Sequence, residues 1–354
     1  MKSIWTILFV ILIFVSFAQR IRNCECGDKQ NHVKQYYETV YRAERFVMAG
    51  NADSALYYYT NARMMMSMMQ SDKANISRLF GLSISDEFKF YFYLNSFKIL
   101  PDSITKEVYM KILSDYISPE LLARLDAQLD GNVKIVQHYN PNDSIISRKI
   151  IQMGYDDQHD GPLWKDGKFK KEKSLRRKSD RKRFFAILDL YKKYGPINFA
   201  SFNGYEPGDF GIILVHNFYD TKLRKKFNPF FENEVRCGNI DPRHYSSNVD
   251  DYLFDSTQVY GSHTIFSVGD TLIVYQLSER GKQRFDVNRK RIFLQDTETT
   301  HQKLIWQWQH YEEFIFIPMC EILPVSREQT AKSIAEYHLK EMGSLVTGYT
   351  IYTR

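Results

Sequence analysis

Apolar residues recur at helical spacing through the first third of the chain, and this pattern predicts a helical module over residues 33–131. Within it, Ser118 and Pro119 supply the N-cap and the first residue of a helix. Asn, Pro, Gly and Asp then become frequent, so residues 132–151 are predicted to be a linker to a second module.

The second module, residues 152–354, begins with apolar spacing that predicts helices over residues 174–254. One apolar helix face stops at Gly195, a residue typical of helix ends. A helix that is apolar nearly all round is expected from about Asp209, and such a helix belongs at the centre of a bundle. Two further helices are expected to begin at capping residues that precede a Pro, namely Asn228 and Asp241.

The apolar period changes to two after residue 263, which predicts β-structure. Residues 264–318 are expected to form a small antiparallel sheet that starts with a hairpin around Gly269 and Asp270. A closing C-terminal helix is predicted over residues 326–342. The predicted fold class is therefore α+β, mostly α. The later strands of the sheet are assigned to 291–296, 303–309 and 312–318.

The first residues combine a Lys with an apolar run from Ile4 to Ala18 that ends in small residues, which is typical of a secretory signal peptide over residues 1–18. Cleavage near Ala18 would leave a short N-terminal segment, residues 19–32. A retained anchor is the alternative, although the run is shorter than the roughly 20 residues that span a bilayer. No later segment is long and apolar enough to span. We expect an exported chain, periplasmic or secreted, that is not an integral membrane protein.

The formal net charge of +6 owes much to residues 165–183, which hold eleven Lys or Arg. A solvated helix face and loop is the favoured interpretation of such a run. Contact with an anionic surface, such as an acidic glycan or membrane, is the alternative. Nucleic acid is not expected as a partner of an exported chain.

Four cysteines are too few for a disulfide framework and lack the spacing of a zinc site. In an oxidising compartment one or two long-range disulfides are expected, with the pairing left open among Cys24, Cys26, Cys237 and Cys320. Because the histidines are scattered and no phosphate-binding Gly loop is present, neither a metal nor a cofactor is predicted.

Residues 36–69 resemble a single tetratricopeptide-like helical hairpin. The resemblance implies two antiparallel helices brought close together by small residues, with aromatic residues between them. A plain helical hairpin fits the same pattern. The positions that carry the resemblance are separated by three to five residues: Ala43, Phe46, Gly50, Ala55, Tyr59 and Ala62. A later helix, ending near Tyr116, carries the apolar stripe Val108, Ile112 and Tyr116.

Six short stretches of the second module follow one another in a recognisable order: DDQ at 156–158, RRKSD at 176–180, KKYGP at 192–196, ILVHN at 213–217, NIDPRHYSSNVDDYLF at 239–254 and QVYGSH at 258–263. In this order they resemble an uncharacterised bacterial family, Domain of Unknown Function 6624, over residues 152–342. The chain departs from the family pattern at Val215, Tyr252 and His263. The resemblance implies an exported module and no particular reaction.

The predicted site joins His216, on the expected central helix, to the QVYGSH segment placed over it. A buried imidazole needs a partner for each ring nitrogen. The residues expected around this site, as partners or binding residues, are Asp157, Gln158, Arg177, Asp180, Asp251, Gln258, Tyr260 and Gly261.

Two functions from different classes fit this arrangement. The favoured one is a non-catalytic envelope protein that binds an unknown protein or peptide, with the site acting as a buried polar network. The alternative is a hydrolase-like enzyme that uses His216 with Asp157 or Asp251, Tyr260 and the Gln258–His263 loop. Catalysis is left open, and burial of His216 and Tyr260 is the feature that separates the two.

Overall fold

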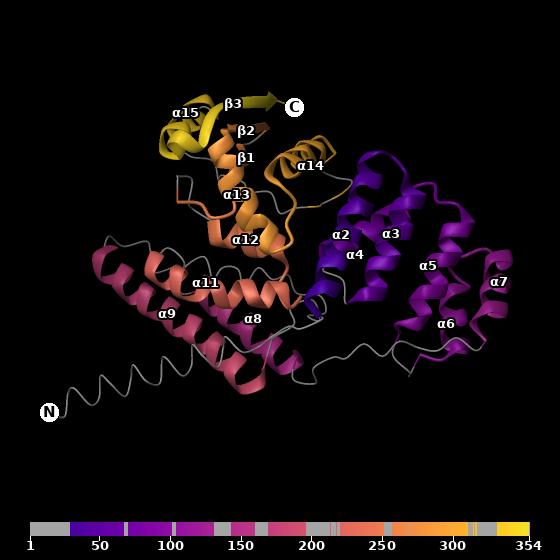
Figure 1. The fold of residues 1–354 in the computed structure, drawn as a ribbon. Helices are drawn as coiled ribbons and strands as arrows, with labels where there is room; N and C mark the ends of the chain where they lie inside the picture. Colours follow the sequence, from indigo (N-terminus) through magenta and orange to yellow (C-terminus); the bar gives the residue numbers. More distant parts are fainter. Residues whose placement is uncertain are drawn as a thin grey trace.

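Helices make up most of the part of the chain that the structure describes, and a small antiparallel sheet accompanies them, as the α+β prediction requires (Figure 1). The computed structural model describes residues 29–66, 70–100, 104–130, 143–159, 169–195, 213, 217, 220–250, 257–268, 270–310, 314, 316 and 331–353. The predicted signal peptide, the Gly269 position and the 312–318 strand except Phe314 and Phe316 lie outside these residues.

The first module is helical, as predicted. Its helices are α2 (Lys29–Met48), α3 (Ala52–Met65), α4 (Gln70–Leu79), α5 (Asp86–Lys98), α6 (Lys106–Leu113) and α7 (Pro119–Leu129). Gly50 turns the chain between α2 and α3 with φ of +71°. Ala43, Ala55 and Ala62 are fully buried where these two helices pack together. The small residues therefore permit close helix packing, while the tetratricopeptide resemblance itself stays a prediction.

The α6–α7 pair shows one confirmed prediction and one unexpected surface. Ser118 accepts a hydrogen bond from the Leu121 amide and caps α7, with Pro119 as its first residue. The apolar stripe faces solvent instead of the core: Val108 and Ile112 of α6, and Tyr116 in the turn after it, are 42%, 50% and 77% exposed. The helix ends at Leu113, before the predicted end near Tyr116. The buried side of this segment is formed by Tyr109 and Leu113.

The helical half of the second module consists of α8 (Asp143–His159), α9 (Phe169–Tyr194), α11 (Thr221–Arg236) and α12 (Pro242–Asp250). The predicted end of α9 at Gly195 and start of α12 after Asp241 are confirmed. The predicted linker over 132–151 is wrong at its end, because α8 begins at Asp143. Of the expected central helix, only Ile213 and Asn217 are described, and both are helical and buried.

The predicted helix start at Asn228 is also wrong. Asp220 is the N-cap of α11, where its carboxylate accepts hydrogen bonds from the Lys222 and Leu223 amides. Pro229 consequently lies inside the helix, where it removes an internal hydrogen bond. Burial of Phe227 and Phe231 on either side of it offsets that loss.

The sheet has three antiparallel strands in the order β1 (Ile265–Val268), β2 (Thr271–Leu277) and β3 (Val346–Thr353). The β1–β2 hairpin is confirmed. The strands predicted over 291–296 and 303–309 are wrong, because the chain there forms α13 (Glu279–Arg291), a short turn and α14 (Thr297–Gln309). Neither Phe314 nor Phe316 is in a strand. The third strand instead follows the closing helix α15 (Ala331–Met342) and the turn Gly343–Leu345.

Helices cover both faces of this sheet (Figure 1). Phe266, Ile273 and Tyr275 pack against α13 and α15 on one face. On the other face, Leu304 and Trp308 of α14 pack against Ile265, Leu272 and Val274. Trp306, Phe314 and Phe316 contribute to the core of the first module rather than to the sheet. The two modules therefore share one continuous apolar contact.

Candidate functional site

One carboxylate binds the backbone of the QVYGSH segment, residues 258–263. Asp250, the last residue of α12, accepts hydrogen bonds from the amides of Val259 at 2.7 Å and of Tyr260 and Ser262 at 3.0 Å each. Three backbone donors on one buried carboxylate fix the conformation of the segment. Asp251, which was predicted to partner His216, lies outside the described residues.

The carbonyls of the same segment are held by one face of α13. Arg284, Asn288 and Arg289 donate to the carbonyl oxygens of Gln258, Val259 and Tyr260 respectively. Arg284 and Asn288, four positions apart, lie on the same face of α13, and Arg289 follows Asn288 directly, so the helix binds three successive carbonyls of the loop. Sequence analysis missed these three side chains, because α13 itself was not predicted.

The segment's own side chains are buried and have structural partners. Gln258 is fully buried, accepts from the His263 amide at 3.1 Å and donates to the Met342 sulfur at 3.3 Å. Tyr260, also fully buried, donates to the Glu232 carboxylate at 2.8 Å. Gln258 therefore links the loop to α15, and Tyr260 links the loop to α11.

Gly261 is required at its position for two reasons. Its φ is +67°, and a Cβ there would lie 2.7 Å from the Phe285 ring. We expect Gly261→Ala to lower the free energy of unfolding by about 2 kcal/mol, through backbone strain together with displacement of that ring. Urea unfolding followed by circular dichroism measures this change.

Gly50→Ala is the matched control for that experiment. Gly50 has φ of +71° and nothing within 4 Å of its added Cβ, so the substitution introduces the backbone strain alone. Its expected cost is about 1 kcal/mol. Equal losses for the two variants would mean that the Phe285 contact contributes nothing.

The other predicted site residues are not all placed by the structure. His216 lies outside the described residues, and Asp157 and Gln158 belong to α8 with side chains that also lie outside them. Asp180 is buried on α9, 3.6 Å from the Arg183 guanidinium. Arg177 is exposed on the same helix. The predicted assembly around His216 therefore stays a prediction, and among the described residues it is represented by the sequence neighbours Gln258, Tyr260 and Gly261.

A buried ion network connects the two modules next to this segment. Arg243 of α12 contacts Asp241 at 2.7 Å, Asp72 of α4 at 2.9 Å and Glu44 of α2 at 3.3 Å. Lys303 of α14 contacts the same Glu44 and lies over the Tyr41 ring, 4.4 Å from its centroid. All five charged side chains are at most 2% exposed.

Burial governs the protonation of this network. Burial favours the neutral form of Asp241, but the Arg243 guanidinium outweighs it and holds the pKa of that carboxyl below its usual value. For Glu44, burial prevails over Lys303 and Arg243, so its pKa is raised. Burial likewise lowers the pKa of Lys303 despite the contact with Glu44.

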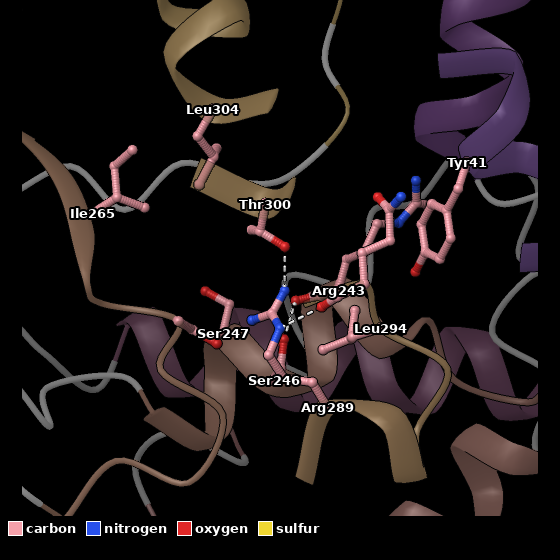
Figure 2. A pocket seen from close by; sticks show the side chains of 11 residues that line it. Tyr41, Arg243, Ser246, Ser247, Ile265, Arg289, Leu294, Thr300 and Leu304 are labelled. Atoms are coloured by element: carbon pink, nitrogen blue, oxygen red, sulfur yellow. Dashed lines mark hydrogen bonds between the residues drawn. The ribbon is translucent and has the colours of Figure 1, made fainter. Parts of the chain in front are cut away.

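A small pocket lies where the modules meet (Figure 2). Residues from α2, α12, α13, α14, β1 and their connecting loops line it, and Figure 2 shows the Arg289 side chain between Thr300 and the serines of α12. Neither Asp, Glu, His nor Cys is among the lining residues, which are Tyr41, Arg243, Ser246, Ser247, Ser262, Ile265, Arg289, Leu294, Gln295, Thr300 and Leu304. Such a lining can bind a polar ligand, but it lacks a nucleophile paired with a base.

Two histidines near the pocket are neutral at ordinary pH. Burial lowers the pKa of His263 to about 4, and the same cause lowers the pKa of His301 to about 4. The His301 ring nitrogen lies 2.7 Å from the Thr264 hydroxyl.

The described residues contain neither a group of three or more His, Cys, Asp or Glu side chains placed to hold a metal nor a helix long and apolar enough to cross a membrane. Comparison with known proteins gives no match to any family model, to any curated protein or to any solved structure.

Proposed function

We propose that this chain is an exported bacterial envelope protein that binds a protein or peptide partner without catalysing a reaction, and that its second module belongs to the Domain of Unknown Function 6624 family. One observation carries the non-catalytic part of the proposal. In the segment predicted to form the active site, Gln258, Tyr260 and His263 are buried, and the side chains of Gln258 and Tyr260 bind Met342 and Glu232.

The competing hydrolase mechanism requires the Gln258–His263 loop to face substrate. Gln258 and Tyr260 have no exposed surface, and His263 is 2% exposed. Asp250, the carboxylate at the loop, accepts three backbone hydrogen bonds, and burial raises its pKa. These features favour a structural network over general acid–base catalysis.

The exposed stripe Val108, Ile112 and Tyr116 supports a protein or peptide partner. Val108 and Ile112 lie one turn apart on α6, and Tyr116 follows in the turn after the helix, so the three form an exposed apolar surface of the kind that a partner helix or peptide can contact. Tyr109 and Leu113 therefore attach the α6 segment to the core, and the stripe on its other side is exposed for contact with a partner.

Two further features support an envelope location. Cys237 is disulfide-bonded, and disulfides persist mainly in oxidising compartments. One face of α9 is strongly basic, and the neighbouring α11 adds Lys222, Lys225 and Lys226. Such a surface suits an anionic envelope component. The exposed cations of α9 are Arg177, Lys178, Arg181, Lys182, Lys192 and Lys193.

Partner capture from the native envelope tests the proposal. The mature chain, with Gln19 expected as its first residue, is cross-linked to envelope extract and its partners are identified by mass spectrometry. Replacing Val108, Ile112 and Tyr116 by Ser is expected to abolish capture of the partner while the fold is kept, because these side chains contribute little to the core.

The control is a variant in which the same residue types are replaced at other exposed positions. Val287, Ile145 and Tyr155 are 58%, 43% and 55% exposed, and their triple Ser variant is expected to capture the partner normally. Equal loss of capture in both variants would remove the case for the stripe.

A parallel panel of ester, amide and glycoside substrates tests the absence of catalysis. The mature chain should turn over none of them, and turnover that His216→Ala abolishes would overturn the non-catalytic assignment.

A further inference from the structure

Two hydroxyl groups at the pocket lack hydrogen-bond partners among the described residues. The Tyr41 hydroxyl and the Ser262 hydroxyl are both buried in this state. Tyr41 is 8% exposed, so water reaches it poorly. Buried polar groups are nearly always paired, and an unpaired hydroxyl that borders a pocket points to a ligand that accepts from it.

Arg289 is a buried cation, and some N–H groups of its guanidinium are not engaged in hydrogen bonds to the described residues. The side chain is 3% exposed, and it donates to the Gln295 and Tyr260 carbonyls and to the Thr300 hydroxyl. These acceptors are neutral and engage three of the five N–H groups of a guanidinium. None of the ion pairs among the described residues includes Arg289.

The surrounding charges set the charge of the ligand. Arg243 is already balanced by Glu44, Asp72 and Asp241. Three carboxylates, Asp250, Asp286 and Asp296, also act electrostatically on Arg289 while they accept hydrogen bonds from backbone amides. These carboxylates would repel a doubly charged phosphate more strongly than a singly charged ligand.

The rest of the lining sets the ligand's shape. Ile265, Leu294 and Leu304 present aliphatic surface beside the polar groups. We propose that this pocket binds the carboxylate of a short aliphatic acid, with Arg289, Tyr41 and Ser262 donating to its oxygens and the three aliphatic side chains contacting its hydrocarbon part. This site is separate from the exposed stripe of α6. The carboxylate can come from a free acid or from the C-terminus of a peptide.

Calorimetric titration of the full mature chain tests this inference. Sodium acetate, butyrate, phosphate and sulfate are compared at constant ionic strength in chloride, together with a short aliphatic peptide in free-acid and amidated forms. Saturable binding of butyrate, with weaker binding of phosphate and sulfate, is expected. Tighter binding of the free-acid peptide than of butyrate would assign the carboxylate to a peptide, and the reverse to a free acid. Binding of phosphate or sulfate above butyrate, or no binding of any carboxylate, overturns the proposal.

Tyr41→Phe tests the site without threatening the fold, because the hydroxyl that it removes has no partner. It is expected to weaken butyrate binding about fivefold, and Ser262→Ala by a similar factor. Tyr191→Phe is the matched control, since the Tyr191 hydroxyl is equally buried and unpartnered but lies outside the pocket lining. Unchanged binding in Tyr41→Phe, or equal weakening in Tyr191→Phe, contradicts the assignment.

Discussion

Arg243→Met is expected to lower the free energy of unfolding by about 3–5 kcal/mol, the cost typical of breaking a buried ion cluster. The substitution leaves Asp241 and Asp72 without their guanidinium, in a site where all these side chains are at most 2% exposed. Glu44 retains only Lys303. Urea unfolding of the purified variant, followed by tryptophan fluorescence and circular dichroism, measures the loss.

Arg124→Met provides the control. Arg124 contacts the Glu87 carboxylate at 2.8 Å and lies over the Phe90 ring, but its side chain is 48% exposed. An exposed pair of this kind contributes about 0–1 kcal/mol, so the control should unfold close to the wild type. A loss in Arg243→Met no larger than in Arg124→Met would show that the buried network does not stabilise the fold.

The network also predicts a change in cooperativity. Glu44 and Asp72 belong to the first module, whereas Arg243 and Lys303 belong to the second. Without Arg243 the modules still share the Lys303–Glu44 pair and the apolar contact through Trp306, Phe314 and Phe316. We therefore expect the wild type to unfold in one transition and the variant in two, with the two transitions detected as non-coincident curves from the two probes.

Local signals in the sequence were sufficient for several elements. The Ser118–Pro119 start of α7, the Asp241–Pro242 start of α12 and the β1–β2 hairpin each depend on neighbouring residues, and all were predicted correctly. Caps and turns satisfy backbone groups within a few positions, so their chemistry is visible in a short window.

The error at α14 has a tertiary cause. Leu304 and Trp308 face the sheet, while Trp306 between them faces the first module. A helix buried on two sides places apolar residues at every second position and imitates the period of a strand. Asp296, whose carboxylate caps α14 through the Thr299 amide, was the local signal that could have corrected the assignment.

The placement of the QVYGSH segment over His216 stays a prediction, because His216 lies outside the described residues. The burial of Gln258 and Tyr260 favours a structural role for the segment. Their partners come from Asp250, from α11 and from one face of α13. Likewise, Arg243 reaches carboxylates 171 and 199 positions away along the chain. Pairings over such separations leave no periodic pattern in one sequence.

Acidification is expected to destabilise the protein through His263 and His301. In the unfolded chain each imidazole takes up a proton near pH 6.5, whereas burial lowers the folded pKa of both to about 4. Between these values the unfolded state binds more protons, so stability falls as pH falls. Each histidine should contribute a loss of about 2–3 kcal/mol between pH 7 and pH 4.5.

Comparison of His301→Gln with the wild type isolates this effect. Buried carboxyls with raised pKa values, including Glu44, Glu234 and Asp250, act in the opposite direction, but they titrate equally in both proteins. Because glutamine can bond Thr264 yet takes up no proton, the variant should lose about 2–3 kcal/mol less than the wild type over the same pH interval. An exposed histidine, His32, is the control, and His32→Gln should follow the wild type. Parallel pH profiles for His301→Gln and the wild type would mean that His301 is protonated equally in the folded and unfolded states, which contradicts its enclosure beside Thr264.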